Sequence, residues 1–309
     1  MKTIILTILF CLAFPFLSFA QIKINNGKLI EYKNFDSQYI KSRNVNIWIP
    51  ENYSEKDSYS VIYMHDGQML YDPSSTWNKQ TWKVDHTIDK LLKADKIENC
   101  IIVGIWNISE DRFYDYFPQK SLSYLNFSSI EKADTSIHLD RFNADNYLSF
   151  IVNELKPFID KNFSTKPEKE HTFLMGSSMG GLISLYGLCE FPDIFGGAAC
   201  LSIHSPMITS KLLTSDNAQI FAPAFCAYLK DHLPEANTRK VYMDLGNETL
   251  DAIYIPFQNK IDEVFWNQGW KLPFKTTNYY PGTSHTENDW ADRLQIPVLF
   301  LLQKAKTNN

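Results

Sequence analysis

Cysteine is scarce in this chain, and neither sign of charge dominates. The 309 residues include five cysteines, and the four that lie beyond the N-terminal segment are widely spaced: Cys100, Cys189, Cys200 and Cys226. They have neither the spacing of a zinc site nor the density of a disulfide framework, so free and mostly buried thiols are expected. With 30 basic and 35 acidic residues the net charge is −5, which argues against a nucleic-acid or anionic-membrane partner.

An apolar run near the N-terminus is too short to span a bilayer. It covers residues 4–19 with few interruptions, follows Lys2, and ends at the small residue Ala20. This pattern predicts a secretory signal peptide over residues 1–20, cleaved after Ala20, and a single domain over residues 21–309. The mature protein is therefore expected to be periplasmic or secreted, without a stable membrane anchor.

Strand-like and helix-like segments alternate along the rest of the chain. Buried strands are expected at residues 45–50, 59–64, 100–106, 171–174, 195–202, 240–246 and 274–280. Helices are expected at residues 81–93, 147–159, 182–189, 251–268 and 287–304. This alternation predicts an α/β fold, a mostly parallel, doubly wound sheet with helices on both faces. The long connection at 107–139 and the irregular stretch at 204–239 are expected to form a cleft wall and a small cap.

The sharpest motif is Gly-Ser-Ser-Met-Gly at residues 176–180, between an expected strand and an expected helix. It fits the pattern G-x-S-x-G, in which the central serine occupies a strained turn that exposes its hydroxyl. Ser178 is therefore the candidate nucleophile. The N–H of Met179, at the start of the following helix, is a candidate donor to a developing oxyanion. The alternative is an ordinary glycine- and serine-rich turn.

A second oxyanion donor is expected in the sequence His-Asp-Gly-Gln at residues 65–68, which follows a buried strand. Loops at the carboxyl ends of parallel strands face the ligand crevice. Gly67 would let the backbone approach a substrate closely, so the N–H of Gly67 or of Gln68 is the candidate. An ordinary Asp-Gly turn is the competing interpretation.

A serine nucleophile needs an imidazole base and a carboxylate that orients it. In α/β-hydrolases these follow in the order serine, acid, histidine. Of the seven histidines, only His285 follows a strand in that order. Two carboxylates compete in the preceding loop, and we favour Glu248, at the loop tip, over Asp251, which is also suited to cap the next helix.

These segments together resemble the esterase D, feruloyl esterase and enterochelin esterase group of α/β-hydrolases. The resemblance rests on residues 63–68, 112–118, 154–159, 176–181, 246–248 and 282–290, which follow one another in the order of the family. It implies an α/β-hydrolase fold with Ser178 as nucleophile, His285 as base and, where members keep the acid, Glu248. Members of the group cleave feruloyl, acetyl, siderophore, thioester or trehalose-mycolate bonds.

The expected function is that of an exported serine esterase acting on a small-molecule or glycan-linked ester through an acyl-enzyme, with no metal and no organic cofactor. Candidate substrate contacts are Tyr114 and Tyr116 in the long connection and His204 in the cap. For the two tyrosines the alternative is that they pack the connection down onto the core. Two alternatives remain open at this point. One is a glycan- or siderophore-binding protein that keeps the fold without turnover. The other is an acyltransferase that uses the same triad.

Overall fold

A computed structural model describes residues 22–125, 138–208 and 215–304. The expected signal peptide therefore lies outside the described residues. Eight strands form one sheet: β1 (Lys28–Phe35), β2 (Arg43–Ile49), β3 (Ser60–His65), β4 (Cys100–Ile105), β5 (Thr172–Ser177), β6 (Gly197–Leu201), β7 (Lys240–Leu245) and β8 (Lys275–Tyr279). The α-helices are α1 (Val84–Lys93), α2 (Arg112–Tyr116), α4 (Ala144–Phe150), α5 (Lys156–Asn162), α6 (Met179–Glu190), α7 (Ser215–His232), α8 (Leu250–Asn267), α9 (Glu287–Arg293) and α10 (Gln295–Leu302).

Short helical turns complete the secondary structure. They are η1 (Gly67–Met69), η2 (Gln119–Tyr124), η3 (Leu139–Arg141), the π-helical η4 (Ile151–Leu155) and η5 (Lys169–His171). The turn η4 joins α4 to α5, so the single helix expected at residues 147–159 is a continuous helix with a π-helical centre. The helix expected at 287–304 is divided into α9 and α10, and Pro297, which lacks an N–H, lies in the first turn of α10.

The strand order is β1-β2-β4-β3-β5-β6-β7-β8, and every pair from β4 to β8 is parallel. Strands β1 and β2 form an antiparallel edge. The chain passes from β3 to β4 on one side and then to β5 on the other side of β3. This reversal creates a switch point at the carboxyl ends of β3 and β5, where open α/β sheets bind ligands.

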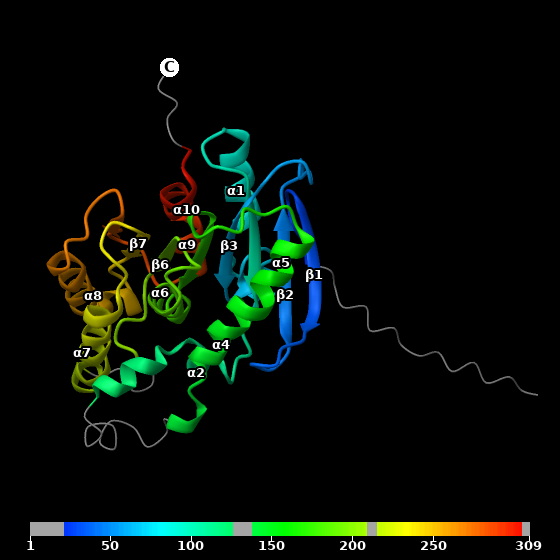
Figure 1. The fold of residues 1–309 in the computed structure, drawn as a ribbon. Coiled ribbons are helices and arrows are strands. Elements are labelled where there is room, and N and C mark those ends of the chain that lie inside the picture. Colours follow the sequence, from blue (N-terminus) through cyan, green and yellow to red (C-terminus); the bar gives the residue numbers. More distant parts are fainter. Residues whose placement is uncertain (1–21, 126–137, 209–214, 305–309) are drawn as a thin grey trace, which may run out of the picture.

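Helices cover both faces of this sheet (Figure 1). Successive strand residues point to opposite faces, so Val61 and Tyr63 of β3 pack in one core while Ile62 and Met64 pack in the other. The first core includes buried residues of α4, α5, α6, α7 and α8, and the second includes those of α1, α9 and α10. The doubly wound α/β-hydrolase fold expected from the sequence is confirmed.

The long connection expected at residues 107–139 contains α2 and η2, and its residues 126–137 lie outside the described residues. The expected cap contains α7, while residues 209–214 lie outside the description. All four cysteines beyond the N-terminal segment are free, and only Cys226 is partly exposed. Burial raises the pKa of the Cys100 thiol to about 12, so this thiol is kept in its unreactive neutral form.

Candidate active site

Ser178 occupies the turn between β5 and α6. Its backbone has φ 56° and ψ −123°, a region that non-glycine residues rarely adopt. A side chain at Gly176 would place its Cβ 2.6 Å from the carbonyl carbon of Gly180, so glycine at 176 is required for the strand and helix to approach this closely. A Cβ at Gly180 would lie 3.3 Å from the side chains of His65 and Asp66. The strained turn is held by the Ser178 N–H, which donates to the Leu201 carbonyl at 2.9 Å. This is the strand–turn–helix geometry expected around Ser178.

The candidate oxyanion donors lie on the two loops that meet at the switch point. Met179 is the first residue of α6, where backbone N–H groups have no partner within the helix. Gly67 and Gln68 begin the turn η1 directly after β3, and Asp66 before them has a left-handed backbone with φ 57°. A Cβ at Gly67 would lie 2.6 Å from the carbonyl carbon of Gly104 on β4, so only glycine fits there.

The turn η1 is fixed by an ion pair at its base. Both carboxylate oxygens of Asp66 accept from Arg112, at 2.8 and 2.7 Å, and one also accepts from the Asn107 amide at 2.6 Å. Burial alone would raise the pKa of Asp66, but the charge and hydrogen bonds of Arg112 outweigh burial and hold the pKa below its usual value. Asp66 is therefore ionised, and the pair anchors the loop that carries Gly67 and Gln68.

His285 is bonded to Asp251, not to Glu248. The Nδ1 atom of His285 lies 2.6 Å from a carboxylate oxygen of Asp251, whose side chain is fully buried. Glu248 is exposed. The preference for Glu248 is therefore corrected: Asp251, in the first turn of α8, points back under the imidazole, while Glu248 lies in the loop before that helix. An ionised carboxylate only accepts hydrogen bonds, so Nδ1 carries the proton and Nε2 is left as the free base.

Two loops are joined to bring His285 over Asp251. The N–H groups of Asn247 and Glu248 both donate to the Thr283 carbonyl, at 3.2 and 3.0 Å. The N–H of His285 donates to the Thr249 hydroxyl at 2.9 Å. Thr249 has the same strained backbone type as Ser178, with φ 54° and ψ −128°. The loops after β7 and β8 thus form one rigid unit that fixes the imidazole.

The second carboxylate oxygen of Asp251 is also fully used. It accepts from the Ser202 hydroxyl at 2.7 Å and from the Gly246 N–H at 2.6 Å. Ser202 in turn accepts from Trp290 at 3.0 Å and from Arg293 at 3.1 Å. Burial alone would raise the pKa of Asp251, but the hydrogen bonds from His285, Ser202 and Gly246 outweigh burial and hold the pKa below its usual value. The carboxylate is therefore charged and fixed in orientation.

Tyr254, which the sequence did not single out, lies against the same site. It is one turn after Asp251 on α8, it is 1% exposed, and its ring meets the ring of His285 edge to face at 5.4 Å. Its hydroxyl lies 2.5 Å from Nδ1 of His204. The Nε2 atom of His204 donates to the Ile208 carbonyl at 2.6 Å, so Nδ1 is the acceptor and Tyr254 the donor. The spacing of three residues from Asp251 is the only sequence signal that could have indicated Tyr254.

The three candidate substrate contacts are not among the residues that line the cleft, although the His204 N–H donates to the Ser178 carbonyl at 3.1 Å. His204 is buried and held by Tyr254 and Ile208. Tyr116 is fully buried against His65, and Tyr114 packs on Phe142 at a separate hollow. None of the three lines the cleft formed by the described residues, because their aromatic rings serve the packing of α2 and of the cap.

Ser178 and His285 line one cleft of about 550 Å³. Its walls are the loop after β3, part of the 107–139 connection, and the loop that leads into α9: Asp66, Gln68, Met69, Trp77, Asn78, Gln80, Trp82, Asn107, Ser109, Arg112, Ser177, Ser178, Leu250, His285, Thr286, Glu287 and Trp290. The candidate nucleophile, the candidate base and Gln68 thus share one space large enough for a small ester.

Comparison with known proteins identifies the family. Residues 37–296 match the model of the Esterase family, described as "Putative esterase". The chain belongs to this esterase family. Among curated relatives, an endo-1,4-beta-xylanase/feruloyl esterase of Xylanibacter ruminicola is 26% identical over 184 residues, which cover 58% of this chain and 22% of that protein. The uncharacterized protein YjcH of Bacillus subtilis is 25% identical over 189 residues, covering 61% of this chain and 65% of that protein. The aligned region spans less than two thirds of either relative.

Solved structures resemble this esterase-family chain over nearly its whole length. A ferulic acid esterase from Anaeromyces mucronatus in complex with ferulic acid is 16% identical and has a TM-score of 0.62. The superposition covers 91% of this chain and 93% of that one. The enterobactin esterase of Shigella flexneri is 15% identical and has a TM-score of 0.61. That superposition covers 91% of this chain and 60% of the other. At these identities the likeness establishes the shared fold.

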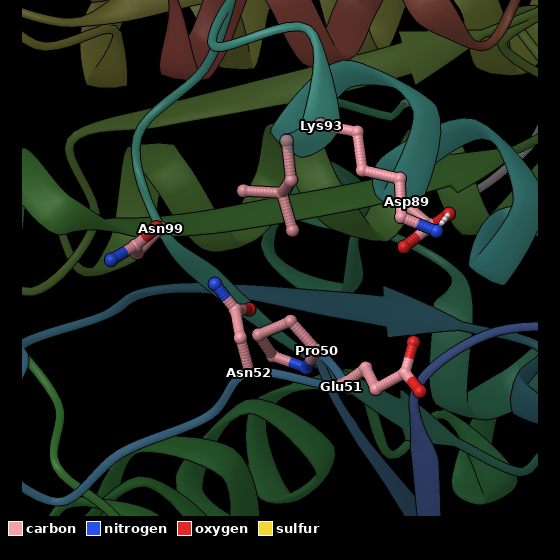
Figure 2. Close-up of a pocket in the computed structure, with 7 residues that line it drawn as sticks. Pro50, Glu51, Asn52, Asp89, Lys93 and Asn99 are labelled. Atoms are coloured by element: carbon pink, nitrogen blue, oxygen red, sulfur yellow. Dashed lines mark ion pairs between the residues drawn. The ribbon is translucent and has the colours of Figure 1, made fainter.

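A hollow of about 340 Å³ lies at the other end of the strands of this esterase-family fold, between the end of β2, the end of α1 and the start of β4 (Figure 2). It is lined by Pro50, Glu51, Asn52, Asp89, Leu92, Lys93 and Asn99, and Asp89 and Lys93 form an ion pair on the α1 side of it. It contains no serine, cysteine or histidine among these residues, so it offers no nucleophile–base pair comparable to Ser178 and His285.

None of the described helices combines the length and apolar character needed to cross a membrane. The described residues contain no group of three or more His, Cys, Asp or Glu side chains positioned to hold a metal ion.

Proposed function

We propose that this chain is a serine esterase in which Ser178, His285 and Asp251 act as the triad. The observation that carries the proposal is that a serine on a strained strand–helix turn shares one cleft with a histidine whose Nδ1 is fixed by a buried carboxylate. Membership of the esterase family and the likeness in fold to a ferulic acid esterase and an enterobactin esterase support it.

The proposed reaction begins with attack of the Ser178 oxygen on the ester carbonyl, while His285 Nε2 takes the hydroxyl proton. The resulting oxyanion is stabilised by the N–H of Met179 and an N–H at Gly67 or Gln68. The protonated imidazole then gives its proton to the leaving alcohol, and an acyl-serine remains. A water molecule then attacks the acyl-serine while His285 takes its proton, and breakdown of the second tetrahedral intermediate releases the acid and free Ser178.

Asp251 has two tasks in this scheme. Its hydrogen bond to Nδ1 keeps Nε2 unprotonated and directed away from the carboxylate, and its charge stabilises the imidazolium that forms at each proton transfer. The bonds from Ser202 and Gly246 leave Asp251 no second orientation.

The test is the Ser178→Ala variant, assayed on p-nitrophenyl acetate. We expect kcat to fall by roughly 10^4 to 10^6, because loss of a triad member removes the activated nucleophile. The purified wild-type protein should also be labelled by a fluorophosphonate at Ser178, as read by mass spectrometry of the labelled peptide. Ser58→Ala, at an exposed serine outside the cleft lining, is the matched control and should keep both the label and the turnover. Turnover retained in Ser178→Ala would refute the proposal.

A further inference from the structure

Trp77 is the most exposed large apolar side chain in the described part of the chain, with 84% of its surface accessible. It lines the cleft that holds Ser178 and His285. An indole this exposed at the rim of a cleft leaves a large apolar face in water. A ligand ring stacked on that face would remove apolar surface of both rings from water.

The turn that carries Trp77 is hydrogen-bonded to two other segments, the start of α9 and the turn η1. On one side, the Asn78 amide donates to Glu287 at 2.7 Å, and the Asn288 N–H donates to the Gln80 side chain at 3.3 Å. On the other side, the Thr81 hydroxyl and the Trp82 N–H both donate to the Met69 carbonyl, at 2.9 and 3.0 Å. The backbone next to Trp77 is therefore held at a defined place, so that only the indole side chain itself has to be ordered when a ligand arrives.

The contacts of Asn78 and Gln80 place Trp77 on the His285 side of the cleft, because their partners Glu287 and Asn288 begin α9 just after His285. In the proposed reaction His285 gives its proton to the leaving alcohol. The wall on this side of the cleft therefore faces the alcohol half of the ester, whereas the acyl half remains on Ser178.

We propose that Trp77 determines specificity for esters whose alcohol half carries a ring, which stacks on the indole. This inference rests on the proposed function and deepens it. A sugar ring, through its C–H face, and an aromatic ring, through its π face, both offer the flat surface that an indole accepts. The acyl half is not selected by this contact.

The experiment compares esters that differ in one half at a time. Ethyl acetate has no ring, benzyl acetate and an acetylated methyl xyloside carry a ring in the alcohol, and ethyl cinnamate carries a ring in the acyl group. Trp77→Ala should lower kcat/KM about tenfold more on the two ring-bearing acetates than on ethyl acetate, mainly through KM. Trp77→Phe should recover part of the loss. The two acetates separate an aromatic ring from a sugar ring as the preferred partner.

Trp266 supplies the matched control. It is 77% exposed and lies near the end of α8, outside the cleft lining. Trp266→Ala should leave the ratio of kcat/KM values unchanged. An extra loss on ethyl cinnamate alone, an equal loss on all four esters, or no loss in Trp77→Ala would each overturn the inference.

A binding measurement separates this inference from the proposed function. In the Ser178→Ala background, saturation-transfer NMR with benzyl alcohol and with methyl xyloside reports ring binding without turnover. Loss of the NMR signal in Ser178→Ala/Trp77→Ala, with the signal of Ser178→Ala/Trp266→Ala unchanged, supports the Trp77 site. This holds even if the wild type hydrolyses no ester, because the absence of hydrolysis would refute only the esterase activity. An unchanged signal in the Trp77 double variant overturns the site even if the wild type is an active esterase.

Discussion

At the scale of single residues, the assignment of the acid depends on where a helix begins. Glu248 and Asp251 are three positions apart in the same loop-to-helix junction, and both would satisfy the chain order of a triad. Only Asp251 is inside the first turn of α8, buried and bonded to His285. Its remaining oxygen is held by Ser202, a residue that lies far away in the sequence.

Asp251→Asn is therefore expected to lower kcat by about 10^4, because an amide in this position favours the wrong imidazole tautomer. Glu248→Gln should change kcat by less than about threefold, since an exposed side chain outside the hydrogen-bond network has no part in orienting the base. Steady-state kinetics on p-nitrophenyl acetate measure both. A larger loss in Glu248→Gln than in Asp251→Asn would return the role of the acid to Glu248.

At the scale of elements, the site depends on two loops from neighbouring strands that behave as one. Thr283 accepts hydrogen bonds from both Asn247 and Glu248, and Gly246 lies so close that a Cβ there would come within 2.1 Å of the Thr283 carbonyl oxygen. The position of His285 relative to Asp251 is thus set by backbone contact between the loops as well as by the Asp–His bond itself.

Gly246→Ala should separate these loops and displace His285. We expect kcat to fall by about 100-fold, the size of effect that a misplacement of about 1 Å produces, together with a lower melting temperature. Gly269→Ala is the matched control, because Gly269 also has a special backbone (φ 82°) but nothing within 4 Å of its Cβ position. It should lose about 1 kcal/mol of stability and keep its kcat. A Gly246→Ala variant with wild-type kcat would contradict the role given to the joined loops.

At the scale of the whole molecule, two buried histidines couple stability to pH. Burial lowers the pKa of His65 to about 3 and that of His204 to about 4. In the unfolded chain both would titrate near pH 6.5. Between about pH 6.5 and pH 4 the unfolded state therefore binds protons that the folded state does not, and the free energy of unfolding falls as the pH falls.

Each of these histidines is expected to contribute about 1.4 kcal/mol of lost stability per pH unit across that window. Urea unfolding of the wild type at pH 7, 6 and 5 measures the slope. In His204→Asn the free energy of unfolding should change by about 1.4 kcal/mol less per pH unit than in the wild type, whatever the absolute stability of the variant. An unchanged slope in His204→Asn would mean that this histidine does not resist protonation in the folded state.

Export is a second prediction that concerns the whole chain. Expression of residues 1–309 in a Gram-negative host should yield a periplasmic or secreted protein whose N-terminal residue is Gln21, as read by intact-mass analysis. Ala20→Arg should block the cleavage, because signal peptidases require a small residue at the junction. An intact N-terminal Met1 on the exported protein would exclude the predicted signal peptide.

The sequence by itself determined the features that depend on neighbours along the chain. The two glycines around Ser178 predict the strained turn because steric conflict there is local, and the apolar runs predict the parallel strands because a buried strand needs apolar residues on both faces. The edge strand β1 was not predicted, since its sequence is mixed and it is only partly buried, so that pairing with β2 decides its conformation.

Tertiary structure decided what depends on residues far apart in the sequence. Asp251 reached His285 because the loops after β7 and β8 are joined, and Tyr254 lies beside them because it is one helical turn further along α8. For Tyr114 and Tyr116 the sequence left both cleft contact and loop packing open, and the energy gained by burying aromatic rings placed them in the packing of α2. Pattern reports which side chains are apolar or titratable, whereas the partner that each one meets is settled only when the chain is packed.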